Sequence, residues 1–233
     1  MYMKMIPKIH FSIDDVLGCL LWLEENRKST IFDSHVFFLA KQIWDRYGIM
    51  TTCNVFYENE RGCLDDVSGR YRKELILNKY IMFSFHGRNS ECNYRTASYD
   101  QAKSDYNVII DNIARIAGED SISTIVRTHL FAGNKDAVRA WRDCGVKVLL
   151  TADDNRQSYD LTKQEEMQCK QNVYFNHSTG LSYIATDIRV ENYLEKSIDI
   201  ECLNNKPVIL FTHEWLLNNS DVIATLFRIL DSL

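Results

Sequence analysis

The sequence lacks the features that divide a chain into domains or hold it in a membrane. Only two of its 233 residues are proline, and it contains no linker rich in glycine, serine and proline and no internal repeat. We therefore expect a single domain over residues 1–233. No stretch approaches the roughly 18 apolar residues that a spanning helix needs, and the first residues show no apolar segment followed by a small-residue cleavage site. These absences predict a soluble, cytoplasmic protein without a membrane partner.

Paired cysteines and clustered positive charge are also missing. The seven cysteines are odd in number and include no C-x-x-C pair, so we expect mostly reduced core residues. The net charge is -5, and the lysines and arginines are spread along the chain instead of forming a block. This distribution argues against a nucleic-acid partner. With 45% hydrophobic and 25% charged residues, the chain has the composition of an ordinary globular protein with a large core.

What the sequence does contain is an alternation of short apolar runs and amphipathic helical stretches. The apolar or β-branched runs predict strands at residues 9–12, 49–57, 81–86, 124–129, 146–151 and 207–213. Apolar residues three and four apart predict helices at residues 33–47, 71–79, 98–117, 134–144 and 220–230. Ser98 is a predicted N-cap, Gly48 and Gly118 are predicted helix ends, and Trp44 is expected on a buried helix face. This alternation is typical of an α/β protein whose parallel sheet is wrapped in helices.

Residues 155–205 interrupt the alternation. They contain a charged helical segment at 161–170 and a hairpin expected to turn at 176–180. The alternation resumes with the strand predicted at 207–213. We therefore interpret residues 155–205 as an insertion at the active-site end of the fold.

Polar side chains follow five of the predicted strands at their C-terminal ends, where an α/β barrel keeps its chemistry. They are Asp14 and Asp15, His86, Arg127 and His129, Asp153 and Asp154, and His213 and Glu214. Three of the six histidines in the chain fall at this one edge. Histidine together with carboxylate suits borderline divalent metals, and a mononuclear hydrolytic site leaves one coordination position open for water. The strand ends therefore predict a metal site.

The adjacent carboxylates of Asp14 and Asp15 allow two interpretations. Because side chains alternate between the faces of a strand, these neighbours share an environment only if the chain turns there. One aspartate would then hold a metal while the other takes a proton, since like charges this close separate their pKa values. The alternative is a helix N-cap, in which an aspartate before residues 16–23 accepts hydrogen bonds from free backbone N–H groups.

These motifs resemble those of the polysaccharide deacetylases, the NodB-homology family that shares a distorted (β/α) barrel with related glycoside hydrolases. Residues 11–15, Phe-Ser-Ile-Asp-Asp, are similar to the family's Thr-Phe-Asp-Asp-Gly motif. This likeness implies Asp14 as general base and Asp15 as a metal ligand. His86 stands where the family's His-x-x-x-His motif begins, which implies a second ligand. The fold implied is an α/β distorted (β/α) barrel of about seven parallel strands, with the hairpin region inserted.

Two further stretches resemble the remaining motifs of the family. The Arg-Thr-His-Leu-Phe-Ala-Gly stretch that begins at Arg127 is similar to the Arg-x-Pro motif, which implies that this arginine orients the catalytic base. The Leu-Phe-Thr-His stretch that ends at His213 is similar to the closing motif, which implies a general acid. The resemblance implies Asp153 or Asp154 as the carboxylate that orients this imidazole. Glu214, the next residue in the chain, is an alternative partner.

The sequence departs from the family pattern at the metal site. Ser90 stands in the place of the second metal-binding histidine, and Val16 in that of the glycine after the aspartate pair. The tryptophan expected after the aspartate of the fourth motif is absent. We expect His129, which replaces the proline of the third motif, to supply the third ligand. Zinc suits these ligands best, and cobalt, nickel and manganese are alternatives.

The resemblance implies a metal-dependent hydrolase that removes an acyl group from an N- or O-acylated carbohydrate. The side chains expected to contact this substrate are Asp154, Glu214, Trp215 and Tyr57, with Tyr159 and Tyr183 as further stacking candidates. Two other functions stay open. A relative with an incomplete metal site would bind carbohydrate without catalysis. A metal-free glycoside hydrolase would instead pair one of the two N-terminal aspartates with Asp153 or Asp154.

Overall fold

Parallel strands form the centre of the fold. The computed structural model of the chain describes residues 6–196, 198, 203 and 206–233. One sheet is all parallel and has the order β10 (Ile188–Arg189), β11 (Val208–His213), β1 (Ile9–Val16), β2 (Thr51–Phe56) and β5 (Ile81–Gly87). The second sheet has the order β6 (Ile125–Val126), β7 (Val148–Thr151), β9 (Leu181–Ala185) and β8 (Tyr174–Asn176), and β8 is antiparallel to its neighbour. The hairpin of β3 (Glu58–Asn59) and β4 (Gly62–Cys63) lies outside both.

Scattered contacts, and not a continuous ladder, join the edges of the two sheets. Next to β5, Phe83 forms an isolated parallel bridge with Ile122, and the Ser84 hydroxyl donates to the Ile125 carbonyl at 2.9 Å. At the other edge, only two residues separate β9 of the second sheet from β10 of the first, and the N–H of one of them, Asp187, donates to a carbonyl of β11 at 2.8 Å. The predicted α/β class with a central parallel sheet is confirmed. The seven-stranded barrel is not, because the pairing is divided between two sheets.

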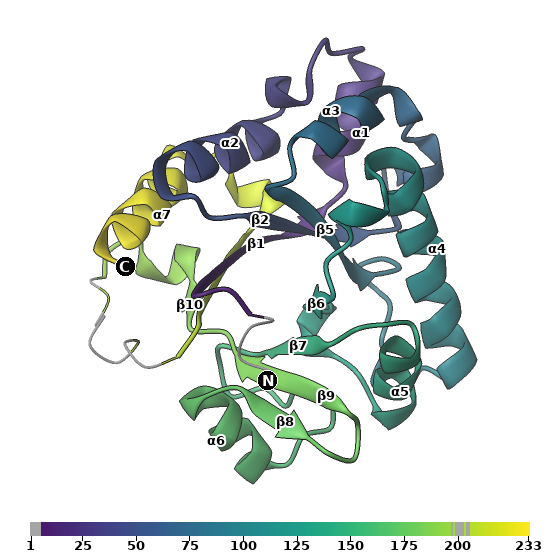
Figure 1. The fold of residues 1–233 in the computed structure, drawn as a ribbon, viewed down its shortest axis with the longest axis vertical. Helices are drawn as coiled ribbons and strands as arrows, with labels where there is room; N and C mark the ends of the chain where they lie inside the picture. The colour runs from purple at the N-terminus through teal and green to yellow at the C-terminus, as the bar shows by residue number, and fades with distance from the viewer. Residues whose placement is uncertain (1–5, 197, 199–202, 204–205) are drawn as a thin grey trace.

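Helices cover the outside of the sheets (Figure 1). They are α1 (Gly18–Glu25), α2 (His35–Tyr47), α3 (Arg72–Leu77), α4 (Tyr99–Ala117), α5 (Lys135–Asp143), α6 (Lys163–Gln171) and α7 (Ser220–Ser232). Ser98 caps α4 as predicted, and its hydroxyl accepts from the Gln101 N–H at 3.2 Å. Gly48 ends α2 with a φ of 66°, also as predicted. The prediction for Trp44 is wrong, since it is 41% exposed and stacks on Tyr80.

Two predictions about the second half of the chain are corrected. The expected strand at 124–129 is reduced to β6, because His129–Phe131 form a 3-10 turn in which Leu130 has a φ of 56°. Residues 155–205 are not an insertion as a whole, since β9 pairs with β7 and β10 pairs with β11. The expected hairpin is present as β8 and β9, with Gly180 at a φ of 71° in its turn. The strand pattern therefore continues through this stretch.

Both faces of β1 are buried, which brings polar groups into the interior. Phe11 and Ile13 pack into the main hydrophobic core, while His10, Ser12 and Asp14 alternate with them and are also almost inaccessible. Buried polar groups need hydrogen-bond partners inside the protein. The partners of this polar face build the candidate site.

The cysteines are only partly core residues. The six described cysteines are free: Cys19, Cys53 and Cys169 are buried, and Cys63, Cys92 and Cys144 are partly exposed. Cys202 and residues 1–5 lie outside the described residues. Within the part of the chain that the structure describes, no helix combines the length and the apolar character needed to cross a membrane.

Candidate metal and active site

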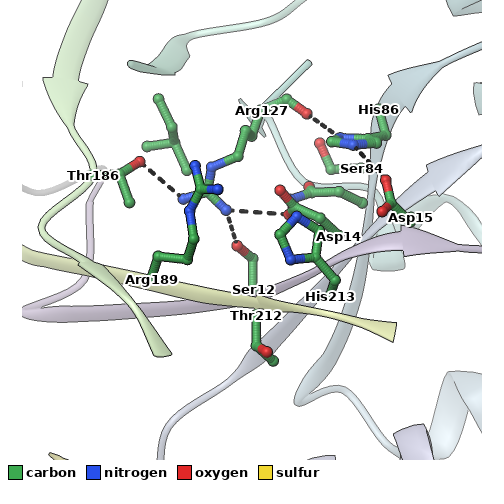
Figure 2. Close-up of polar contacts among 12 residues, drawn as sticks. Ser12, Asp14, Asp15, Ser84, His86, Arg127, Thr186, Arg189, Thr212 and His213 are labelled. Atoms are coloured by element: carbon green, nitrogen blue, oxygen red, sulfur yellow. Dashed lines mark hydrogen bonds and ion pairs between the residues drawn. The ribbon is translucent and has the colours of Figure 1, made fainter. Parts of the chain in front are cut away.

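The adjacent aspartates at the end of β1 point into different surroundings (Figure 2). The register between β1 and β2 shifts between Ile13 and Val16, and Asp15 has a φ of 63°, so the chain turns at this residue. Asp and Asn tolerate this conformation better than most side chains do. The N-cap interpretation is wrong, because both aspartates belong to β1 and Leu17 precedes α1 without a side-chain cap.

Asp14 lies in a buried hydrogen-bond network. Its Oδ1 accepts from Asn54 Nδ2 at 2.6 Å and from a guanidinium nitrogen of Arg127 at 3.1 Å. Arg127 is 1% exposed and also donates to the hydroxyls of Ser12 at 2.6 Å and Thr186 at 3.2 Å. A planar guanidinium held at several points fixes the direction of its carboxylate partner. Arg127 and Asp14 therefore form the expected pair, as Figure 2 shows.

Asp15 meets the two histidines that were expected as metal ligands. One ligand atom from each of Asp15, His86 and His129 lies within 4.8 Å of the others. Asp15 Oδ1 is 3.2 Å from His86 Nε2 and 3.7 Å from His129 Nδ1, and it is a buried atom without a well-formed hydrogen bond. His86 Nδ1 lies 2.7 Å from the Arg127 carbonyl oxygen, which only accepts, so Nδ1 carries a proton and Nε2 faces Asp15.

The charges of this group depend on one another. Burial raises the pKa of Asp15, but hydrogen bonds with His129 and His86 and the charge of His86 outweigh burial and hold it well below the usual range. For His86 the directions are reversed. Burial lowers its pKa, but the carboxylates of Asp14 and Asp15 outweigh burial, so the pKa is raised. The carboxylate of Asp15 and the imidazole of His86 thus each favour the charged form of the other.

These three side chains fit a divalent metal. A tetrahedral ion with bonds of about 2 Å separates its ligand atoms by about 3.3 Å. The distances of 3.2 and 3.7 Å from Asp15 Oδ1 are close to this value. The ion would also complete the coordination of Asp15 Oδ1, the buried oxygen without a well-formed hydrogen bond. Ser90, at the place of the missing histidine, lines the same cleft and is exposed.

His213 is oriented by a carboxylate that the sequence did not reveal. Its Nδ1 donates to Glu191 Oε1 at 2.7 Å, and the Thr212 hydroxyl donates to the other oxygen of Glu191 at 3.1 Å. Glu191 follows β10 directly, in the 3-10 turn η7 (Val190–Tyr193). It was missed because β10 has two residues and no visible apolar run. If residues 188–189 had been predicted as a strand, Glu191 would have been expected near a strand end, like the other site residues.

The carboxylates predicted to orient His213 have other partners. Asp153 forms a two-point ion pair with Arg189 at 2.7 and 3.0 Å, and Asp154 pairs with Arg156 at 2.7 Å. These predictions are wrong because an arginine from the same region already neutralises each aspartate.

Glu214 is likewise not a partner of His213. Its buried carboxylate accepts from the backbone N–H groups of Leu17 at 2.9 Å and Gly18 at 3.1 Å, and from that of Cys19. Burial raises the pKa of Glu214 although these N–H groups favour its ionised form. It is thus turned toward the backbone at the start of α1 and away from the imidazole.

A cleft of about 610 Å³ opens from the metal-site residues to the surface. Asp15 and His129 lie in its wall, together with Trp22, Trp215 and the β3–β4 hairpin. Trp215 is 64% exposed, and its indole N–H donates to Asp15 Oδ2 at 3.2 Å. Its ring also lies against that of His213, with centroids 5.5 Å apart. An exposed aromatic ring beside these groups suits contact with a sugar face.

The expected tyrosines are not part of this cleft. Tyr57 donates to Asp65 at 2.7 Å and does not line the cleft. Tyr159 and Tyr183 are buried, so they pack in the core and cannot stack on a sugar. Aromatic residues near strand ends are more often packing residues, and only exposure separates the two roles.

Solved structures match the fold of this chain, whereas neither protein-family models nor curated proteins match its sequence. A protein from Mycobacterium smegmatis assigned as a polysaccharide deacetylase is 15% identical over 96% of this chain and 82% of that one, with a TM-score of 0.56. A family 4 acetyl xylan esterase from Clostridium thermocellum, solved with a cobalt ion, is 11% identical over 96% of this chain and 83% of that one, with a TM-score of 0.51. The chain has the fold of the polysaccharide deacetylases.

The deacetylase fold is shared by proteins with other activities. A 4-alpha-glucanotransferase from Thermococcus litoralis is 14% identical over 95% of this chain and 38% of that one, with a TM-score of 0.52. The chain also spans 60% of the length of a CE4 family pseudoenzyme from Bacillus anthracis. At such identities the likeness establishes the fold alone, so the function has to be argued from the residues of the site.

Proposed function

We propose that this protein is a divalent-metal-dependent hydrolase that removes an acyl group from an N- or O-acylated carbohydrate. The observation that carries the proposal is the group of Asp15, His86 and His129, whose ligand atoms lie within 4.8 Å of one another. Two of these residues, Asp15 and His129, line the cleft. The buried ion pair of Asp14 and Arg127 lies beside this group. Zinc is the ion we expect, because two imidazoles and one carboxylate are ligands that it favours.

A divalent ion bound here supplies Lewis acidity toward an acyl carbonyl and lowers the pKa of bound water. Asp14 is the proton acceptor in our proposal. Both of its hydrogen-bond donors, Asn54 and Arg127, reach Oδ1, which leaves Oδ2 to take a proton from the attacking water. The fixed guanidinium keeps this carboxylate aligned for the transfer.

His213 is the proposed general acid. Glu191 accepts from Nδ1, so Nε2 is the nitrogen that would give its proton to the leaving amine or alcohol. Asp14 and His213 are register partners of β1 and β11, so acceptor and donor stand on neighbouring strand ends. Trp215, exposed beside His213, would contact the sugar ring.

The alternatives are less well supported by the same residues. A metal-free glycoside hydrolase needs a second carboxylate free to act, but Asp153 and Asp154 are each neutralised by an arginine. A non-catalytic carbohydrate-binding protein is favoured by Ser90, which replaces one ligand of the family motif. His129 offsets that loss by bringing an imidazole to the group from another strand end.

Metal content and acetate release test the proposal together. Metal-stripped protein would be titrated with zinc and then supplied with acetylated xylan or an N-acetylated chito-oligosaccharide. We expect one tightly bound ion per chain and acetate release that depends on it. His86→Ala and His129→Ala should both weaken zinc binding, whereas His177→Ala, an exposed histidine elsewhere, should not. Absence of specific zinc binding by the unaltered chain would remove the metallohydrolase and leave the binding protein ahead.

A further inference from the structure

We propose that the two residues after His213, Glu214 and Trp215, act as positioning residues for the metal ligand Asp15. They begin the 3-10 turn η9 (Glu214–Leu216) at the end of β11, while Asp15 lies at the end of the neighbouring strand β1. The inference rests on the proposed metal site and deepens it. In this inference, the turn that follows β11 orients the carboxylate of Asp15.

Trp215 holds one oxygen of the carboxylate. Its indole N–H donates to Asp15 Oδ2 at 3.2 Å, while Oδ1 faces His86 and His129 and has no well-formed hydrogen bond. Rotation about the last torsion of an aspartate is broad and weakly hindered. A donor on Oδ2 alone therefore selects which oxygen points at the histidines and favours a single metal bond from Asp15. Outer partners of this kind orient metal ligands in general.

Glu214 holds the backbone that follows the ligand. Helix α1 has no side-chain cap of its own, and the Glu214 carboxylate accepts from the N–H groups of Leu17, Gly18 and Cys19 in its place. A carboxylate at this position satisfies N–H groups that the helix leaves free. A Cβ added to Gly18 would lie 3.2 Å from a Glu214 oxygen, so the approach is close. The turn at Asp15 is thereby tied to the end of β11.

A purely structural role does not account for Trp215. Its side chain is 64% exposed, so it buries little apolar area, and a hydrogen bond open to water adds little to folding. If it contributes through Asp15, its loss should appear in metal affinity and not in the stability of the metal-free protein. These two quantities can be measured separately on the full chain.

The decisive comparison is Trp215→Phe against Trp22→Phe, measured by competition for zinc between the metal-stripped full chain and a chromophoric chelator. Both tryptophans line the cleft, but the Trp22 ring lies against Lys28, whereas the indole hydrogen bond to Asp15 comes from Trp215. Phenylalanine keeps an aromatic ring but is smaller and has no N–H donor, and the same loss of size at Trp22 controls for the size change. We expect Trp215→Phe to weaken zinc binding by about 10-fold to 100-fold, with an unchanged thermal midpoint of the metal-free protein. Trp22→Phe should change neither.

A second variant tests the backbone anchor. Glu214→Gln keeps the size of the side chain and removes the charge that binds the three N–H groups, so both zinc affinity and metal-free stability should fall. If this variant does not fold, Trp215→Phe still decides the inference. Wild-type zinc affinity in Trp215→Phe would overturn the inference and leave the proposed function standing. A wild-type chain without specific zinc binding would overturn both.

Discussion

Asp14 and Asp15 are neighbours in the chain, yet they belong to two regions with opposite chemistry. Asp14 is buried, and Arg127 and Asn54 both donate to its Oδ1. Asp15 is partly exposed, and its buried oxygen faces two histidines without a well-formed hydrogen bond. Asp14 is thus fixed by two protein donors on one oxygen, whereas the oxygen of Asp15 that faces the histidines has no well-formed hydrogen bond. The difference indicates that the Asp14 region fixes the positions of side chains, whereas the Asp15 region would bind the metal ion.

The largest expected effect comes from removing the buried ion pair between Arg127 and Asp14. Arg127→Met removes the charge beside Asp14 and leaves a buried carboxylate without its ion partner, so we expect a loss of about 3–5 kcal/mol of unfolding free energy. In the Asp15 region, His129→Ala should cost less than about 1 kcal/mol, because its ion pair is partly exposed. Urea denaturation of metal-free protein measures both.

Arg142→Met serves as the control, since its pair with Asp143 is exposed, and its loss should stay within about 1 kcal/mol. Equal losses for Arg127→Met and His129→Ala would contradict the division into a buried, ion-paired region and a partly exposed one.

The second prediction concerns the proposed general acid, which lies at the boundary of the two regions. His213→Gln should lower kcat for acetate release by about 100-fold to 10,000-fold, the usual range for a lost acid or base. Its zinc affinity should stay within a few-fold of wild type, because His213 is not among the grouped ligand atoms. Glu191→Gln should give a smaller loss of kcat, since the amide still reaches Nδ1. Unchanged turnover in His213→Gln would rule out the acid role.

A third prediction extends the Asp14 region to His10, which lies on the same face of β1. Burial, reinforced by the charge of Arg127, lowers the pKa of His10 from 6.5 to about 3. The unfolded chain therefore binds a proton below about pH 6.5 that the folded chain does not bind. Stability should thus fall on acidification below this pH, by roughly 1.4 kcal/mol per pH unit, until the pKa of the folded state is reached.

His10→Gln should flatten this part of the pH dependence of unfolding, measured in urea between pH 4 and pH 7, while His177→Gln at an exposed site should leave it unchanged. An identical slope in wild type and His10→Gln would show that His10 is not the group responsible.

The smallest effect is expected at Tyr57, which lies outside the cleft. Tyr57→Phe removes the exposed hydrogen bond to Asp65 and should change KM for the acylated carbohydrate by less than about twofold, with a stability change under about 1 kcal/mol. Trp215→Ala, which strips the aromatic ring from the cleft wall, should raise the same KM clearly more. A large KM effect for Tyr57→Phe would extend the substrate site beyond the cleft.

Local patterns account for the parts of the fold that were predicted. Ser98 and Gly48 act through backbone groups a few residues away, so the start of α4 and the end of α2 follow from their neighbours in sequence. The grouping of Asp15, His86 and His129 was predicted because the carboxyl ends of parallel strands meet at one edge. The exposure of Trp44 was not predictable in this way, since it depends on what packs over α2.

The sequence by itself determined the alternation of strands and helices and the presence of ligand-type side chains at successive strand ends. Only the tertiary structure decided which carboxylate serves which partner. Glu191 reaches His213 from 22 residues away, and Glu214 turns from its neighbour to N–H groups at Leu17, 197 residues earlier in the chain. A hydrogen bond depends on distance and direction in space. Adjacency in sequence therefore suggested Glu214 for His213, while the packing of β10 against β11 supplied Glu191.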